Sequence, residues 1–344
     1  MTQAGHRRTG SLLLLITLAA AAAIRAQAPL APPPRGDATI VSPSARLERL
    51  FGGAVFTEGP AQAPDGSVYF SDITFTRSNN MLSGILWRWD PRTGQTTVFR
   101  SPSGMSNGIE FDAEGRMIVA LGADFGGRAI IRTDMTTGKS TVIGGLHNGR
   151  RLNSPNDLTI DARGRIYFTD PRYVGHESVD QPVQGVYRID TDGRMSLIAG
   201  NAGKPNGIAV SPDQNTLYVA SLDFASSDDL PAATPAGRGL MALLAYDLSA
   251  EGTLSRRRVL VDFAPGNGPD GISVDRDGNI YCAISGPENG VHVFSPAGRE
   301  VAYIPTPEGP TNVKFGRGSD ANVLYITARA NLYRIRIERT GYHP

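Results

Sequence analysis

The chain has 344 residues, of which 40 % are hydrophobic, 34 are Lys or Arg and 33 are Asp or Glu. This near-balance of charge gives no reason to expect nucleic acid or an acidic membrane surface as a partner. The single cysteine, Cys282, excludes an internal disulfide and any zinc site built from several cysteines.

An export signal is the first predicted element, over residues 1–26. A basic stretch at 6–8 precedes an apolar run at 12–24, and small residues follow. The run is too short for a membrane span, so we expect a periplasmic or secreted protein. Removing the signal takes away three of the 34 basic residues and no acid, which leaves 31 against 33. Residues 27–44 are rich in proline, which predicts an extended, disordered linker.

A unit of about 50 residues is then repeated six times. Each copy has a polar residue ahead of a short strand, a tight turn, and an apolar triplet about ten residues further on. The triplets begin at residues 68, 117, 166, 217, 280 and 324. This period, with alternating strands and Asp-Gly-type turns, is typical of the blades of a β-propeller.

Two further strands follow each triplet, and a fourth completes every copy except the last. The stretch ARLERLFGG at 45–53 has the right pattern to supply the missing strand. We therefore predict an all-β, six-bladed propeller over residues 45–340, closed by pairing of the N-terminal strand with the last blade. The fourth copy carries an insertion at 221–239, which we expect to be either a lid over the channel mouth or a surface loop.

An oxygen-bearing residue lies just ahead of the first strand in every copy. These residues are Glu58, Asn107, Asn156, Asn206, Asp270 and Thr311. Because the first strand of each propeller blade lines the central channel, the six side chains should meet at one mouth of it. They either satisfy loop backbone groups or bind a shared ligand. Carboxylate and amide oxygens suit Ca²⁺, Mg²⁺ or Mn²⁺, and the two acids would balance a divalent cation.

The chain resembles the gluconolactonase–regucalcin (SGL) family of six-bladed propellers from about residue 45 to 338. The motifs TEGPAQAPDGSVYFSD, RLNSPNDLTIDARGRIYFTDP, KPNGIAVSPD and GPDGISVDRDGNIY carry the resemblance in this order. The resemblance implies a lactonase, a carboxylic ester hydrolase that acts on a sugar lactone with one divalent metal. Ca²⁺ is the expected metal, with Mg²⁺, Mn²⁺ or Zn²⁺ as alternatives, and its implied ligands are Glu58, Asn156, Asn206 and Asp270.

The implied chemistry is polarisation of the lactone carbonyl by the metal, followed by attack of water. Either Asp270 acts as the catalytic base or metal-bound water is the nucleophile, and these roles conflict because a bound cation lowers the pKa of Asp270. Some members have an Arg two residues before the first ligand Asn; Ser154 stands there, so we expect sugar recognition to differ. Further candidates for substrate contact are Asn107, Asp170, Tyr173 and His176.

Two other functions fit the same residues. The ring could hydrolyse other lactones or phosphotriesters, because the metal does not distinguish between these substrates. Alternatively, the metal could brace a non-enzymatic binding module, since propellers are common interaction platforms. The expected partner of the enzyme is a small lactone, and we expect a monomer or a weak oligomer.

Overall fold

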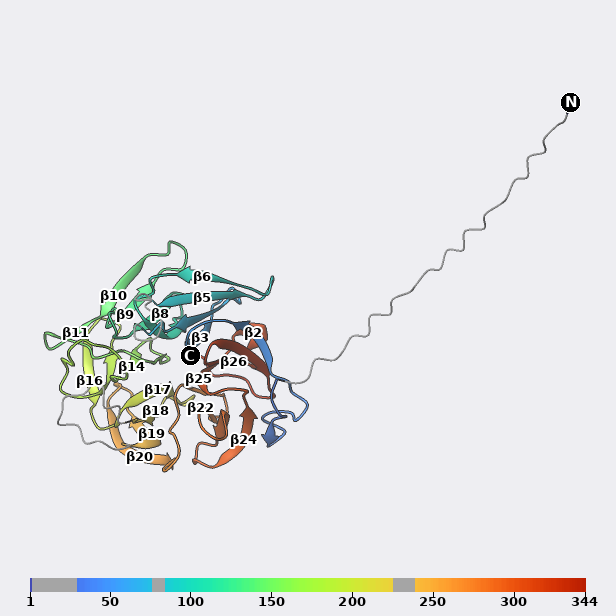
Figure 1. The fold of residues 1–344 in the computed structure, drawn as a ribbon. Coiled ribbons are helices and arrows are strands. Elements are labelled where there is room, and N and C mark those ends of the chain that lie inside the picture. Colours follow the sequence, from blue (N-terminus) through green and yellow to red (C-terminus); the bar gives the residue numbers. More distant parts are fainter. Residues whose placement is uncertain (2–29, 76–83, 225–238) are drawn as a thin grey trace.

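The predicted six-bladed propeller is confirmed. The computed structural model describes residues 1, 30–75, 84–224 and 239–344, and these residues form six blades of four or five strands around a central channel (Figure 1). The export signal predicted at 1–26 lies outside the described residues apart from Met1. Residues 225–238 of the predicted insertion also lie outside them. No helix among the described residues is long and apolar enough to cross a membrane.

Each blade is an antiparallel sheet with four strands in order outward from the channel, and blade 5 has a fifth strand at its outer edge. Blade 1 contains β3 (Thr57–Gln62), β4 (Val68–Asp72), β5 (Ile85–Asp90) and β6 (Gln95–Arg100), and blade 2 contains β7 (Ser106–Phe111), β8 (Met117–Leu121), β9 (Ala129–Thr133) and β10 (Ser140–Gly144). Blade 3 contains β13 (Leu158–Ile160), β14 (Ile166–Asp170), β15 (Gly185–Ile189) and β16 (Met195–Ala199), and blade 4 contains β17 (Pro205–Val210), β18 (Thr216–Leu222), β19 (Met241–Leu248) and β20 (Leu254–Asp262). Blade 5 contains β21 (Ile272–Val274), β22 (Ile280–Ile284), β23 (Gly290–Phe294) and β24 (Glu300–Pro305), and blade 6 contains β25 (Pro310–Phe315), β26 (Val323–Ala328), β27 (Asn331–Arg336) and β2 (Glu48–Gly52). A short hairpin of β11 (Leu146–His147) and β12 (Arg150–Arg151) follows blade 2, and a 3₁₀ turn, η1 (Gly318–Asp320), precedes β26.

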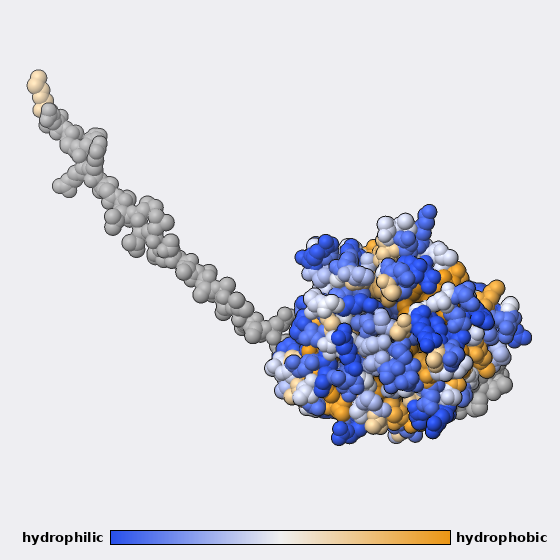
Figure 2. Space-filling view, turned by 180° about the vertical axis from the view of Figure 1, so that it is seen from behind, coloured by the Kyte–Doolittle hydropathy of each residue, from blue (hydrophilic) through white to orange (hydrophobic). Residues whose placement is uncertain are grey.

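The second strand of each blade explains the apolar triplets of the sequence. A sheet packed between two neighbouring blades is covered on both faces, so its inner strands are continuously apolar instead of alternating. All five residues of β4, β14 and β22 are accordingly buried. Cys282 lies in β22 and is fully buried, as expected for a packing residue. On the outside, hydrophilic side chains cover most of the face seen in Figure 2, with apolar residues between them.

The ring closes through β2, as the sequence predicts. This strand pairs antiparallel with β27, with Glu48 opposite Arg334. Phe51 of the same strand also contacts blade 1, where its ring centroid lies 5.4 Å from that of Phe70 and 5.1 Å from that of Trp87. Strand β2 therefore joins the last blade to the first.

The prediction of a disordered linker is wrong for residues 35–44. β1 (Arg35–Gly36) pairs with β24 as a fifth strand of blade 5, with Arg35 opposite Tyr303. Ile40 and Val41 are buried in the cluster between blades 5 and 6. The proline-rich composition of residues 27–44 predicted no packing, but this apolar pair packs against the propeller.

The C-terminal residues also extend the domain beyond the predicted limit of 340. Gly341 forms a β-bridge with Asp275, and the backbone N–H of Tyr342 donates to the Val274 carbonyl at 3.1 Å. These contacts bring the end of the chain to the middle of the ring, where Figure 1 marks it.

Candidate functional site

Five of the six predicted ring residues line one cavity at a mouth of the channel. They are Glu58, Asn107, Asn156, Asn206 and Asp270, and the cavity measures about 190 Å³. Thr311 is the exception, because its hydroxyl donates to the Thr57 carbonyl at 2.7 Å and so ties blade 6 to blade 1. The repeated position therefore delivers oxygens from five blades to a single site.

Backbone contacts between neighbouring blades fix the width of this ring. The N–H of Gly108 donates to the Asn156 carbonyl at 2.8 Å, and the N–H of Gly207 donates to the Asp270 carbonyl at 2.9 Å. A Cβ on Gly207 would lie 2.5 Å from that Asp270 oxygen, so only glycine permits the approach. The ring residues are thus held by main-chain bonds that are independent of their own side chains.

Asp170 anchors the loop that presents Asn156 and does not itself line the cavity. Its two oxygens accept the backbone N–H groups of Ser154 at 2.7 Å and Asn153 at 2.8 Å. Burial raises the pKa of Asp170 to about 7, although these two N–H donors oppose the rise. Asp72 does the same in blade 1, where it accepts two backbone N–H groups ahead of β3 at 2.9 Å. The predicted substrate contact of Asp170 is therefore replaced by a positioning role.

The two remaining candidates differ in their placement. Tyr173 lines the cavity, and its hydroxyl donates to the Leu222 carbonyl at 2.9 Å. His176 lies outside the cavity, with 47 % of its side chain exposed and its Nε2 3.7 Å from a carboxylate oxygen of Asp124. His176 is therefore not among the described residues that line the cavity, and its substrate contact stays a prediction.

Two buried amide oxygens of the ring, Oδ1 of Asn107 and Oδ1 of Asn206, have no hydrogen-bond partner among the described residues. A buried acceptor without a donor costs about 1–3 kcal/mol, so such atoms indicate a missing ligand. They share their cavity with two carboxyl groups, Glu58 and Asp270. An electropositive ligand would satisfy all four groups at once.

The carboxyl groups of Glu58 and Asp270 also indicate an electropositive ligand. Burial, and then the charge of Asp270, raises the pKa of Glu58 well above its usual value. Burial, and then the charge of Asp157, raises the pKa of Asp270 to about 8, while the Asn206 amide opposes the rise. The residues therefore fit a divalent cation that would offset this repulsion.

The chemistry of the donors narrows the choice of cation. Among the described residues, no three His, Cys, Asp or Glu side chains cluster as a metal site. The ring instead offers two carboxylates and several amide oxygens. Such hard, mostly neutral donors fit Ca²⁺ better than Zn²⁺, which favours nitrogen and sulfur ligands.

A column of polar residues below the ring was missed by sequence reasoning. The Asn312 amide donates to Glu58 at 3.4 Å and to Asp157 at 3.3 Å. The Lys314 ammonium lies 3.8 Å from Asp157 and 3.1 Å from Glu110. Burial lowers the pKa of Lys314, but the two acids outweigh burial and raise it overall. A charged lysine therefore occupies the middle of the channel.

The repeat does contain a signal for this column. The residue after each ring position is glycine in four copies: Gly59, Gly108, Gly207 and Gly271. The other two copies have Asp157 and Asn312 at this position. Their side chains fill the channel beside Gly108 and Gly271, which have no side chain. Three residues after the ring position, only Glu110 and Lys314 are charged. Exceptions within the repeat thus mark the column.

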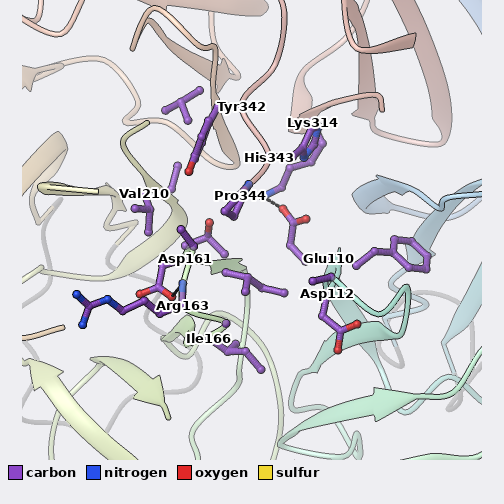
Figure 3. A pocket seen from close by; sticks show the side chains of 18 of the residues that line it. Glu110, Asp112, Asp161, Arg163, Ile166, Val210, Lys314, Tyr342, His343 and Pro344 are labelled. Atoms are coloured by element: carbon purple, nitrogen blue, oxygen red, sulfur yellow. Dashed lines mark hydrogen bonds and ion pairs between the residues drawn. The ribbon is translucent and has the colours of Figure 1, made fainter. Parts of the chain in front are cut away.

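A larger cavity of about 550 Å³ lies at the other end of the column (Figure 3). Glu110 and Lys314 point into it, and Tyr342 and His343 from the C-terminal residues form part of its wall. Its acids are already paired, as Glu110 is with Lys314 at 3.1 Å. In the described lining of this cavity, no buried side-chain oxygen lacks a hydrogen-bond partner, in contrast to the ring.

The fold agrees with comparisons to known proteins. The family model described as "SMP-30/Gluconolactonase/LRE-like region" matches residues 56–330. A gluconolactonase of Zymomonas mobilis is 30 % identical over 335 residues, which covers 90 % of this chain and 85 % of the relative. A solved gluconolactonase structure from Xanthomonas campestris has a TM-score of 0.74 and 28 % identity, covering 90 % of this chain and 96 % of that one. The diisopropyl-fluorophosphatase of Loligo vulgaris is 25 % identical, covering 83 % of this chain and 90 % of the relative.

Proposed function

The chain belongs to the SMP-30/gluconolactonase/LRE-like family, and we propose that it hydrolyses lactones in the cavity ringed by Glu58, Asn156, Asn206 and Asp270. The observation that carries the proposal is the convergence of two buried carboxyl groups and two unpartnered amide oxygens on one small cavity. Relatives named gluconolactonase support the reaction class.

Glu58, Asn156, Asn206 and Asp270 would hold one divalent cation, with Ca²⁺ the first choice and Mg²⁺, Mn²⁺ or Zn²⁺ as alternatives. The chemistry that such a cation supplies is polarisation of the lactone carbonyl and stabilisation of the developing oxyanion. Support for this assignment comes from the unpartnered Oδ1 of Asn206 and the raised pKa of both acids.

Asp270 is the proposed base. Its carboxylate would take a proton from the attacking water as the water oxygen bonds to the carbonyl carbon, and the ring C–O bond would then break. The proton would pass to the leaving alkoxide, which gives the open hydroxy acid. Support for this role is the position of the Asp270 side chain in the wall of the same cavity. Asn107 has a free Oδ1 with which to accept a hydrogen bond from that water or from the substrate.

Sugar lactones are the reference substrates, since the resemblance implies them and the relatives are named for them. Phosphotriesters are a second candidate class, favoured by the relative named diisopropyl-fluorophosphatase. Export through residues 1–26 would place either activity in the periplasm or outside the cell.

The test is a panel of lactones and one phosphotriester, assayed with chelated protein to which each of the four metals is restored. We expect turnover of lactones with Ca²⁺ and a loss of 10²–10⁴-fold in kcat for Asp270→Asn, the usual contribution of a general base. Calcium should also raise the melting temperature of the wild type, and less so that of Asn206→Ala. Metal-induced stabilisation without turnover of any substrate would instead favour the metal-braced binding module.

A further inference from the structure

We propose that the preferred lactone carries apolar substituents rather than hydroxyl groups on its ring. This inference rests on the proposed function, because it concerns the same cavity and deepens the assignment of its substrate.

The walls of the cavity above the ring are apolar. They include Phe56, Ile73, Phe75, Met105, Leu222 and Phe224. The rings of Phe56 and Phe75 pack edge to face with centroids 5.3 Å apart, so they form one continuous surface in blade 1. Leu222 is the last residue of β18 and Phe224 follows it, in blade 4, which lies across a six-bladed ring from blade 1. A bound ring would therefore lie between two apolar walls.

The described walls contain two hydroxyl groups, and each makes a hydrogen bond within the protein. The Ser154 hydroxyl accepts the backbone N–H of Ala123 at 2.9 Å, and the Tyr173 hydroxyl donates to the Leu222 carbonyl at 2.9 Å. No Lys, Arg or His belongs to the described lining of the cavity. Apart from the ring oxygens, the described walls offer a sugar almost no partner for its hydroxyl groups.

The size of the cavity agrees with a small apolar ligand. Its 190 Å³ is less than the roughly 300–1,000 Å³ of common ligand pockets, so a single ring with a short chain would fill it. Each methylene buried there should raise kcat/KM about fourfold, which corresponds to ~0.8 kcal/mol. Each hydroxyl buried without a partner should lower kcat/KM by about tenfold or more.

The experiment compares three six-membered lactones in the presence of calcium: D-glucono-1,5-lactone, δ-hexanolactone and δ-octanolactone. The quantity compared is kcat/KM divided by the rate constant of spontaneous hydrolysis, because the substituents change intrinsic reactivity. We expect δ-hexanolactone to exceed the gluconolactone by at least about tenfold, and δ-octanolactone to exceed δ-hexanolactone further. A gluconolactone preferred over both would overturn the inference and leave the proposed function intact.

A pair of variants tests whether the apolar walls of the cavity cause the preference for apolar lactones. Phe224→Ser at the rim should abolish the advantage of δ-octanolactone over δ-hexanolactone. Leu197→Ser is the matched control, because Leu197 is 38 % exposed on an outer strand and Phe224 is 37 % exposed. An unchanged ratio in Phe224→Ser would contradict the inference, as would an equal change in the control. Failure to hydrolyse any lactone with any of the four metals would overturn the proposed function, and this inference with it.

Discussion

Single side chains decide what the channel contains. Lys314 comes from β25 and Glu110 from β7, and their ion pair of 3.1 Å crosses the channel. Burying two acids near the ring would be costly without a cation among them. The lysine supplies that cation permanently, which leaves the ring above as the place where an exchangeable cation is needed.

Lys314→Met should lower the free energy of unfolding by about 3–5 kcal/mol, because it leaves Glu110 and Asp157 buried without their cation. Chemical denaturation followed by fluorescence measures the change. Glu110→Gln in the same chain should recover part of the loss. Arg317→Met is the matched control, since Arg317 is more exposed and lies 3.7 Å from Glu110. Equal losses in the two single variants would contradict a special role for Lys314.

Glu58→Gln should stabilise the protein in a chelating buffer at pH 8.5 by about 1–3 kcal/mol, because one of two repelling buried carboxyl groups is removed. The same variant should lose most of the rise in melting temperature that calcium gives the wild type. Glu48→Gln is the control, since Glu48 is 57 % exposed and should change neither quantity by more than about 0.5 kcal/mol. A wild type as stable as Glu58→Gln without metal would count against the repulsion described for the ring.

Strands and their ends set the positions of these side chains. An Asp at the end of the second strand holds the loop ahead of the first strand in blades 1 and 3, through Asp72 and Asp170. The strand β2 holds the two ends of the ring together, both by pairing with β27 and by packing Phe51 against blade 1. The closure is therefore both hydrogen-bonded and hydrophobic.

Phe51→Ala should cost about 2–3 kcal/mol, somewhat less than a fully buried phenylalanine, because Phe51 is only partly buried. Val98→Ala on the outer strand of blade 1 is the control, with 52 % exposure and an expected effect below about 0.5 kcal/mol. Thermal and urea denaturation of both variants measure the difference. If Phe51→Ala behaved like the control, the closure would depend on the β2–β27 pairing alone.

The features predicted correctly from the sequence are those with a local cause. Apolar triplets follow from strands buried on both faces, and the ring residues follow from their fixed place ahead of the first strand. The features missed depend on distant contacts. Asn312 and Asp157 are 155 residues apart in the chain, and Ile40 is buried only because blades 5 and 6 cover it. The direction of the His176 side chain depends on the course of an irregular loop, which the repeat does not specify.

At the scale of the whole molecule, the C-terminal residues cover the channel end opposite the ring. The Nε2 of His343 lies 2.9 Å from the Gly316 carbonyl, and the Tyr342 hydroxyl accepts a hydrogen bond from Gln214 at 3.0 Å. Burial, aided by the charge of Arg317, lowers the pKa of His343 to about 4, although Glu110 opposes the fall. The packed tail therefore requires a neutral histidine.

This requirement predicts a dependence of stability on pH. The unfolded histidine has a pKa near 6.5, so the contribution of His343 is fully present above pH 6.5 and is lost as the pH falls toward 4. Acidification across this window should cost the wild type on the order of 1–2 kcal/mol more than it costs His343→Gln. Denaturant titrations at pH 7, 5.5 and 4.5 test the difference. Parallel profiles for the two proteins would show that His343 can be charged in place.

The main-chain bonds between neighbouring first strands have a consequence for how such a protein can change. Since Gly108 and Gly207 hold the blades together without help from the side chains beside them, the oxygens presented to a ligand can be exchanged while the radius of the opening stays constant. New substrate preferences can therefore arise one residue at a time, on a frame that does not have to be rebuilt.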